Sequence, residues 1–139
     1  EQASAIGEVP VGAVVVRGDT IISRGLNLRE TLGDPTAHAE ILALRGAALV
    51  LGGWRLPDTT IYVTVEPCPM CVGAIVAARV ALLVYGARDP KGGAVESIVS
   101  LIDLPGLNHK VEVIGGVLEE ESGALLKKFF QQLRTRRDG

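Results

Sequence analysis

Hydrophobic and polar positions along the first third of the chain predict a hairpin followed by a helix. The β-branched runs 11–16 and 20–26 flank the turn signal Gly18-Asp19, which predicts two antiparallel strands. A polar loop then leads to an apolar stretch over 37–51, where we expect a helix with Thr36 as its N-cap. This part of the chain is therefore expected to supply two strands and one helix.

The middle of the chain has a strand–helix–strand pattern. Residues 60–65 are apolar or β-branched, which is typical of a strand buried on both faces. Pro69 suits the first position of a helix over 69–78 and makes Cys68 its cap. A second apolar run at 80–85 completes a crossover that should be parallel and right-handed. We expect this unit to be the centre of the fold.

The last third has few regular patterns before its end. Residues 86–110 are loop-rich, with one set of helical turns expected around 95–101. A strand at 111–114 precedes a helix over 119–134, where acids at the start and bases at the end suit the helix dipole. We expect one α/β domain over residues 1–139, whose N-terminal helix is truncated to the first few residues.

Composition narrows the class of protein. The chain has 139 residues, 47% of them hydrophobic and only 4% aromatic, which suits an aliphatic core between helices and a sheet. Its apolar runs are too short for a membrane span, and no secretory signal is recognisable. Cys68 and Cys71 are the only cysteines, and one disulfide between such close positions could not stabilise a fold of this length. We therefore expect a reducing, cytoplasmic location.

Three side chains suited to zinc fall at the starts of predicted helices. Cys68 and Cys71 lie at i and i+3 in the first turn of one helix, where the helix dipole favours thiolates. His38 is expected in the first turn of the preceding helix. Zinc usually has four ligands, but the chain has no third cysteine, and its other histidine, His109, belongs to a different loop. We expect three protein ligands, with the fourth position left for water.

Glu40 is predicted to act beside this metal site. Side chains at i and i+2 of a helix point apart, so Glu40 is not expected to be a ligand alongside His38. It would instead approach the water, whose pKa zinc can lower from about 15.7 toward neutrality. A carboxylate placed there can move protons between water and substrate, a role worth roughly 10²- to 10⁴-fold in rate.

Each of these residues has an ordinary explanation when taken singly. A lone His38 is more often a capping or core histidine, a lone Glu40 is a solvated acid of a first helical turn, and Cys-Pro-Met-Cys alone suits a redox pair or two buried thiols. The redox interpretation leaves His-Ala-Glu unexplained. The order His-x-Glu, then Pro-Cys-x-x-Cys about thirty positions later, is a complete signature of zinc deaminase chemistry.

With this signature the chain resembles the zinc-dependent nucleobase deaminases, and most closely the bacterial tRNA-specific adenosine deaminases. Four further stretches carry the resemblance across nearly the whole chain: Glu8-Val9-Pro10-Val11-Gly12-Ala13, Asp34-Pro35-Thr36-Ala37-His38-Ala39-Glu40, Tyr85-Gly86-Ala87-Arg88-Asp89 and Asn108-His109-Lys110-Val111-Glu112.

The resemblance implies a fold and a set of roles. The fold is the three-layer α/β/α arrangement of cytidine deaminases, with a mixed five-stranded sheet flanked by helices. The three side chains suited to zinc bind Zn²⁺, and Glu40 shuttles protons. Asn27 hydrogen-bonds the substrate nucleoside, and Glu66 and Pro67 line the pocket as further substrate-binding residues.

The implied reaction is hydrolysis of adenosine to inosine at the wobble position of a tRNA anticodon, by a homodimer without a membrane partner. Net charge is −2, yet five basic residues accompany one acid from Ser122 onward, so local basic surface is available for RNA phosphates. Candidate RNA contacts follow the fourth strand and lie on the last helix: Arg88, Asp89, Lys91, Lys127, Lys128 and Arg134, with Arg136 and Arg137 beyond them.

Two alternatives differ in their use of the site. Pro-Cys-Pro-Met-Cys also occurs in guanine deaminases, so a deaminase of guanine or of another free base or nucleoside is the nearest rival. A non-catalytic, zinc-stabilised RNA-binding module is the second alternative. That module would need neither Glu40 nor an open ligand position, which argues against it.

Overall fold

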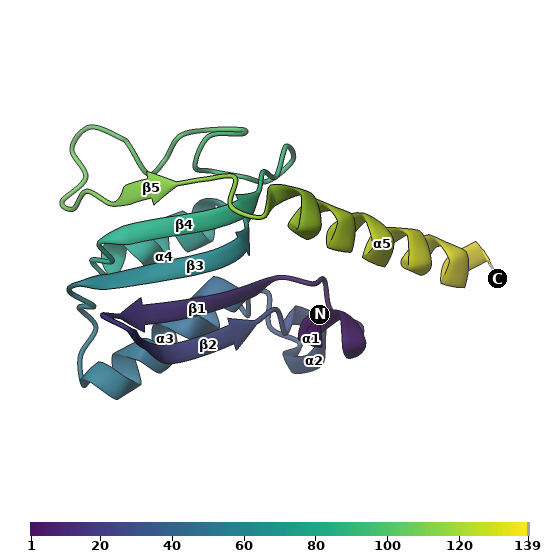
Figure 1. The fold of residues 1–139 in the computed structure, drawn as a ribbon, viewed down its shortest axis with the longest axis horizontal. Helices are drawn as coiled ribbons and strands as arrows, with labels where there is room; N and C mark the ends of the chain where they lie inside the picture. The colour runs from purple at the N-terminus through teal and green to yellow at the C-terminus, as the bar shows by residue number, and fades with distance from the viewer. Residues whose placement is uncertain (139) are drawn as a thin grey trace.

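A five-stranded sheet is the framework of the molecule (Figure 1). The computed structural model describes the backbone of residues 1–138 and the side chains of residues 1–135. In chain order the elements are α1 (Gln2–Ala5), β1 (Gly12–Arg17), β2 (Thr20–Leu26), α2 (Arg29–Leu32), α3 (Ala39–Leu51), β3 (Thr59–Val65), α4 (Pro69–Ala77), β4 (Leu82–Ala87), β5 (Glu112–Ile114) and α5 (Glu119–Asp138).

The sheet is mixed, with strand order β2-β1-β3-β4-β5. The hairpin strands β1 and β2 are antiparallel, and β1 also pairs antiparallel with β3. The pairs β3–β4 and β4–β5 are parallel. The predicted α/β class, the hairpin and the parallel strand–helix–strand unit are therefore confirmed.

Helices α3 and α4 pack together over one face of the sheet (Figure 1). Three neighbouring strands contribute Val15, Ile61 and Leu83, which are completely buried beneath the two helices. Ala43 of α3 and Ile75 of α4 are completely buried with them. Burial of each large aliphatic side chain contributes roughly 1.5–3 kcal/mol. This aliphatic core fixes the two helices whose first residues build the site.

Strand β2 and helix α3 approach so closely that only glycine fits between them. A Cβ atom added to Gly25 would lie closer than 3.0 Å to the Ala39 carbonyl oxygen and the Ala43 backbone nitrogen. Real Cβ atoms essentially never come that close to such atoms, so a larger residue would push α3 away. The start of α3, next to His38, depends on this contact.

Strand β3 is not buried on both faces, as its apolar run had predicted. Its residues alternate, with Ile61 fully buried and Tyr62 42% exposed. The reason is that α3 and α4 cover one face only. The other face is bordered by the start of α5, where Ser122 lies against Gly86 of β4.

Two predicted boundaries move by two residues. Helix α3 begins at Ala39 and not at residue 37, because the backbone N–H and the hydroxyl of Thr36 both donate to Asp34 Oδ1, each at 2.8 Å. Thr36 is thus held in a turn and His38 takes the N-cap position. Strand β4 begins at Leu82 and not at residue 80, because Arg79 reverses the chain with a φ of 64°.

Two loops differ from the prediction in their regular structure, one having less than expected and the other having more. The helical turns predicted around 95–101 are absent from the described chain, which has only turns and bends in that segment. Conversely, the polar loop before α3 contains the short helix α2. No helix in the described part of the chain combines the length and the apolar character needed to cross a membrane.

Candidate active site

The starts of α3 and α4 meet because of the sheet topology. Strands β2 and β3 are both antiparallel to β1, so they run in the same direction and their following loops leave from the same edge of the sheet. His38 lies at the N-cap of α3, and Cys68 at the N-cap of α4, where Pro69 occupies the first helical position as predicted. Both N-caps have extended backbone, which directs their side chains to this edge.

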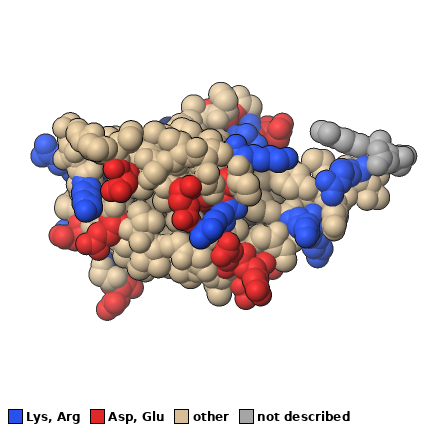
Figure 2. All heavy atoms as spheres, turned by 90° about the horizontal axis from the view of Figure 1, so that it is seen from above, with Lys and Arg blue, Asp and Glu red and all other residues tan. Residues whose placement is uncertain are grey.

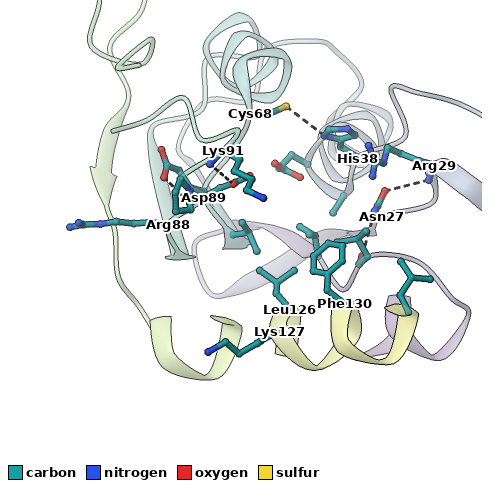
Figure 3. Close-up of a pocket in the computed structure, with 18 of the residues that line it drawn as sticks. Asn27, Arg29, His38, Cys68, Arg88, Asp89, Lys91, Leu126, Lys127 and Phe130 are labelled. Carbon is teal, nitrogen blue, oxygen red and sulfur yellow. Dashed lines mark hydrogen bonds between the residues drawn. The ribbon is translucent and has the colours of Figure 1, made fainter. Parts of the chain in front are cut away.

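Three ligand atoms gather at this point. The ligand atoms of His38, Cys68 and Cys71 all lie within 4.8 Å of one another. The His38 Nδ1 atom is 3.6 Å from Cys68 Sγ (Figure 3) and 3.5 Å from Cys71 Sγ. Zinc–sulfur and zinc–nitrogen bonds of about 2.3 and 2.05 Å at a tetrahedral angle would separate nitrogen and sulfur by about 3.6 Å. The donor set and its spacing therefore fit zinc.

The pKa values of the two cysteine thiols are shifted in opposite directions. A hydrogen bond from the Cys71 thiol lowers the pKa of Cys68 to about 5, whereas the same bond, together with burial, raises the pKa of Cys71. Cys68 is thus a thiolate at neutral pH, and Cys71 must release its proton when a cation binds both sulfurs.

Glu40 lies beside the ligand group. The group, as found among the described residues, does not include Glu40. Its residue is 4% exposed, and its side chain lines the same cavity as His38 and Cys68. Burial raises the pKa of the Glu40 carboxyl. His38 is the extended N-cap of α3 and not a helical residue, so the expected separation of helical i and i+2 side chains does not apply to this pair.

The ligand group opens into a cavity of about 890 Å³. The loop before α3, the segment after β3, the loop after β4 and one side of α5 form its walls (Figure 3). This volume accommodates a nucleoside together with part of its flanking backbone.

Asn27 lies at the end of β2 on the cavity wall and is 5% exposed. Its Oδ1 accepts a hydrogen bond from the Arg29 backbone N–H at 3.3 Å, and its Nδ2 donates to the Val9 carbonyl at 3.4 Å. These bonds fix the amide's orientation before any substrate arrives (Figure 3).

Glu66 and Pro67 follow β3 and lie differently from each other. Glu66 lines the cavity, but its carboxylate accepts hydrogen bonds from the loop after β4. Burial raises its pKa, and these hydrogen bonds, led by the one from the Glu96 N–H, outweigh burial and lower the pKa overall. Pro67 is fully buried and is not among the described cavity-lining residues.

Most of the predicted RNA-contact residues reach the cavity. Its lining residues include five of them: Arg88, Asp89, Lys91, Lys127 and Arg134. Lys128 is exposed on α5 but is not among the described lining residues. The side chains of Arg136 and Arg137 lie outside the described ones.

Arg88 lines the cavity but also forms an ion pair with Glu96. Its Nε lies 3.0 Å from Glu96 Oε1 in an ion pair whose side chains are 63% and 44% exposed. The guanidinium points away from the cavity centre, whereas Lys91 points toward it (Figure 3). Figure 2 shows Lys and Arg side chains gathering at the end of the molecule where α5 lies.

Comparison with known proteins assigns the chain to a family. A family model described as MafB19-like deaminase matches residues 1–134. The tRNA-specific adenosine deaminase of Bacillus subtilis is 50% identical over 137 residues, covering 99% of this chain and 85% of that protein. The chain belongs to the family of tRNA-specific adenosine deaminases. The resemblance inferred from the zinc signature is thereby confirmed.

Solved structures extend the family relationship to the fold. A structure from a study of A-to-I editing by tRNA:A34 deaminases at the wobble position has a TM-score of 0.86 and 48% identity, covering 89% of this chain and 90% of the other. A guanine deaminase from Nitrosomonas europaea has a TM-score of 0.73 and 28% identity, covering 91% and 75%. The cytidine deaminase-like arrangement expected from the resemblance is therefore confirmed.

Sequence reasoning missed several residues around the site of this family member. Arg29, Leu126 and Phe130 all line the cavity, and Phe130 points into it from α5 (Figure 3). The spacing of Leu126, Phe130 and Leu133 places them on one side of the helix, which is a signal that the sequence contains. Nothing in the sequence indicates that this side faces the site and not the core.

Proposed function

We propose that this protein hydrolyses adenosine to inosine and ammonia at the wobble position of a tRNA anticodon. The observation that carries the proposal is the group of His38, Cys68 and Cys71, which lies beside buried Glu40 at a cavity edged by basic side chains. Membership of the tRNA-specific adenosine deaminase family supports the choice of substrate.

The metal proposed for the site is Zn²⁺. One imidazole nitrogen and two cysteine sulfurs would hold it, a donor set typical of zinc. Zinc bound there would supply an activated water at neutral pH as the nucleophile. The remaining chemistry falls to the side chains of the protein.

Glu40 is the proton carrier in this proposal. Water adds its oxygen to C6 of adenine while the Glu40 carboxylate takes up a proton. Protons returned by Glu40 reach the ring and the departing amine, so that the C6–N6 bond breaks and ammonia leaves. Adenosine and water are thus converted to inosine and ammonia without any other reactant.

Asn27 orients the nucleoside. Its amide is already held by Arg29 and Val9 at the cavity wall, so its free hydrogen-bonding capacity has a fixed direction. The target base must leave its stack to enter the cavity, which costs least in a single-stranded loop. An anticodon loop meets that requirement.

Basic side chains at the rim would bind the RNA backbone. Lys91, Lys127 and Arg134 line the cavity and are exposed, so they can reach phosphates on either side of an extruded base. We assign Lys128 to the same role on the outer part of α5. Asp89 can accept a hydrogen bond from a ribose hydroxyl.

We also propose that the protein is cytoplasmic and homodimeric. A reducing compartment keeps both metal-binding cysteines unpaired. Many large hydrophobic side chains remain exposed, including Leu49, Val50 and Trp54, which supports burial against a second subunit. Sedimentation of the zinc-loaded protein would decide this, because a monomer at micromolar concentration contradicts the dimer.

A guanine deaminase is the second candidate, and the Nitrosomonas europaea structure favours it as the nearest alternative. The deciding experiment uses an anticodon stem-loop with one adenosine at the wobble position and a matched stem-loop with that adenosine in the stem. We expect inosine only in the first RNA. Deamination of free guanine, with neither RNA altered, would support the alternative and overturn the proposal.

A further inference from the structure

The loop of residues 88–97 forms one wall of the cavity without any regular secondary structure of its own. Arg88, Asp89 and Lys91 contribute this wall. A segment of this kind has no strand ladder to hold it, so its position depends on individual hydrogen bonds. Those bonds converge on a single carboxylate.

The carboxylate of Glu66 gathers five donors from this loop. The backbone N–H of Asp89 donates to Oε1 at 3.1 Å. The backbone N–H groups of Val95, Glu96 and Ser97 donate to Oε2 at 3.0, 2.9 and 3.0 Å. The hydroxyl of Ser97 donates to Oε1. A carboxylate offers about four lone-pair positions, so Glu66 has no acceptor capacity to spare for a substrate.

The backbone around Glu66 binds the end of β4, just before this loop, and the loop itself. Its N–H donates to the Ala87 carbonyl at 2.8 Å, and the Pro67 carbonyl accepts from the Ala94 N–H at 2.8 Å. A Cβ atom at Gly93 would lie closer than 3.0 Å to the Glu66 carboxylate. The loop is therefore wrapped closely around this side chain.

The effect of Glu66 reaches the cavity through Asp89. The Asp89 N–H is bound to Glu66, and Asp89 Oδ1 accepts the N–H groups of Lys91 and Gly92, each at 3.1 Å. This turn sets the direction in which Lys91 leaves the loop, toward the cavity (Figure 3).

We propose that Glu66 is a positioning residue, which holds the loop 88–97 in place so that Asp89 and Lys91 meet the RNA, and that it does not contact the substrate. This inference rests on the proposed function for the identity of the substrate. It assigns Glu66 a different role from the substrate contact expected from the sequence.

Two variants and one control isolate this role. Glu66→Gln replaces one acceptor oxygen by an NH₂ group that cannot accept the loop's N–H donors. Gly93→Ala displaces the carboxylate from the other side. Glu96→Gln is the control in the same loop. It weakens the exposed pair with Arg88, but it keeps an oxygen that can accept the hydrogen bond of the Tyr85 hydroxyl, and it keeps the Glu96 N–H bond to Glu66.

The first readout is amide hydrogen exchange of the zinc-loaded full chain. We expect the N–H groups of residues 89 and 95–97 to exchange at least about tenfold faster in Glu66→Gln and Gly93→Ala than in the unaltered protein or Glu96→Gln. Zinc content should stay at one ion per chain. Unchanged exchange in a folded variant would overturn the proposal. Faster exchange accompanied by loss of zinc would overturn it too.

The second readout is steady-state deamination of an anticodon stem-loop. We expect KM to rise on the order of tenfold while kcat changes by less than about threefold, because the loop contacts RNA and not the reacting atoms. A fall in kcat alone would overturn the proposal.

If the unaltered protein deaminates no RNA, the proposed function fails, and the exchange measurement still decides the role of Glu66. If Glu66→Gln does not fold, Gly93→Ala decides.

Discussion

At the scale of single residues, the proposed metal ligands and the proposed proton carrier are different side chains. His38, Cys68 and Cys71 place nitrogen and sulfur at the spacing that zinc requires. Glu40 is buried beside them but contributes no ligand atom to the group. Removing Glu40 should therefore affect the reaction and leave the metal in place.

Glu40→Gln is the change that tests this separation. It keeps the size of the side chain but cannot take up a proton, so we expect kcat to fall by at least about 10²-fold. Zinc content and melting temperature should stay close to those of the unaltered protein. A variant with near-normal turnover, measured by inosine formation, would mean that another group carries the proton.

The residues of the metal group were predictable from the sequence, but their surroundings were not. A fixed spacing of His, Glu and two Cys is a local pattern tied to one chemistry. Glu66 was expected to line the substrate pocket, but its hydrogen bonds to the loop after β4 were not foreseen, because its partners lie 23 to 31 positions away in a loop without a recognisable pattern. Such long-range hydrogen bonds leave no periodic signal in the chain.

At the scale of elements, Glu8 fixes the short helix α2 beside the site. Its residue is 1% exposed, and its carboxylate accepts the N–H groups of Glu30 and Thr31 at 3.1 and 2.7 Å. These are the unpaired donors of a helix start. Helix α2 was missed in the sequence because its cap lies about twenty residues upstream and not next to it.

This cap predicts a pH dependence of stability. Burial raises the pKa of Glu8, but the hydrogen bonds from Thr31 and Glu30 outweigh it and lower the pKa below 4.5. The stabilisation is thus present above about pH 4.5 and is lost as the pH falls through the lowered pKa. We expect Glu8→Gln to lower the free energy of unfolding by about 1–2 kcal/mol at pH 7.

Urea unfolding between pH 7 and pH 3 provides the measurement. The difference between Glu8→Gln and the unaltered protein should shrink as the pH falls below about 4.5, because protonated Glu8 resembles glutamine. Glu112→Gln, on the exposed strand β5, is the control and should have little effect. A difference that does not change with pH would contradict the cap.

The metal is expected to connect α3 with α4. His38 belongs to the start of one helix, and Cys68 and Cys71 belong to the start of the other. We expect removal of zinc by a chelator to abolish deamination and to lower the melting temperature by several degrees. The chelator should lower the melting temperature of Glu40→Gln by the same number of degrees. It should change the melting temperature of His38→Ala only a little. Full activity after verified loss of metal would contradict the mechanism.

Element types were predicted better than element limits. The hairpin and the β3–α4–β4 unit follow from local hydrophobic patterns that the structure retains. The limits of α3 and β4 moved because the Asp34–Thr36 turn and the positive φ of Arg79 override those patterns. Side chains and backbone angles at the ends of elements decide where they begin.

At the scale of the whole molecule, overall charge and local charge differ. The net charge is −2, yet the cavity is lined by five basic side chains and three acidic ones. Two of the acids, Glu40 and Glu66, are buried, so the exposed rim is basic. We therefore expect attraction of RNA to depend on this rim and not on the protein's net charge.

Salt dependence of RNA binding tests the rim. We expect the affinity for an anticodon stem-loop to fall as salt rises, and Lys91→Ala and Arg134→Ala each to reduce the slope of log K against log salt by about one. Lys110→Ala is the control, because Lys110 is exposed outside the described cavity lining. Equal slopes for all three variants would place the RNA elsewhere.

The central claim is the choice of adenosine in RNA as the substrate. The most direct measurement compares ammonia release from a wobble-adenosine anticodon stem-loop, free guanine and cytidine by one zinc-loaded preparation. We predict one ammonia and one inosine per stem-loop, with guanine and cytidine unchanged. Conversion of guanine or cytidine, with the stem-loop left intact, would contradict the account.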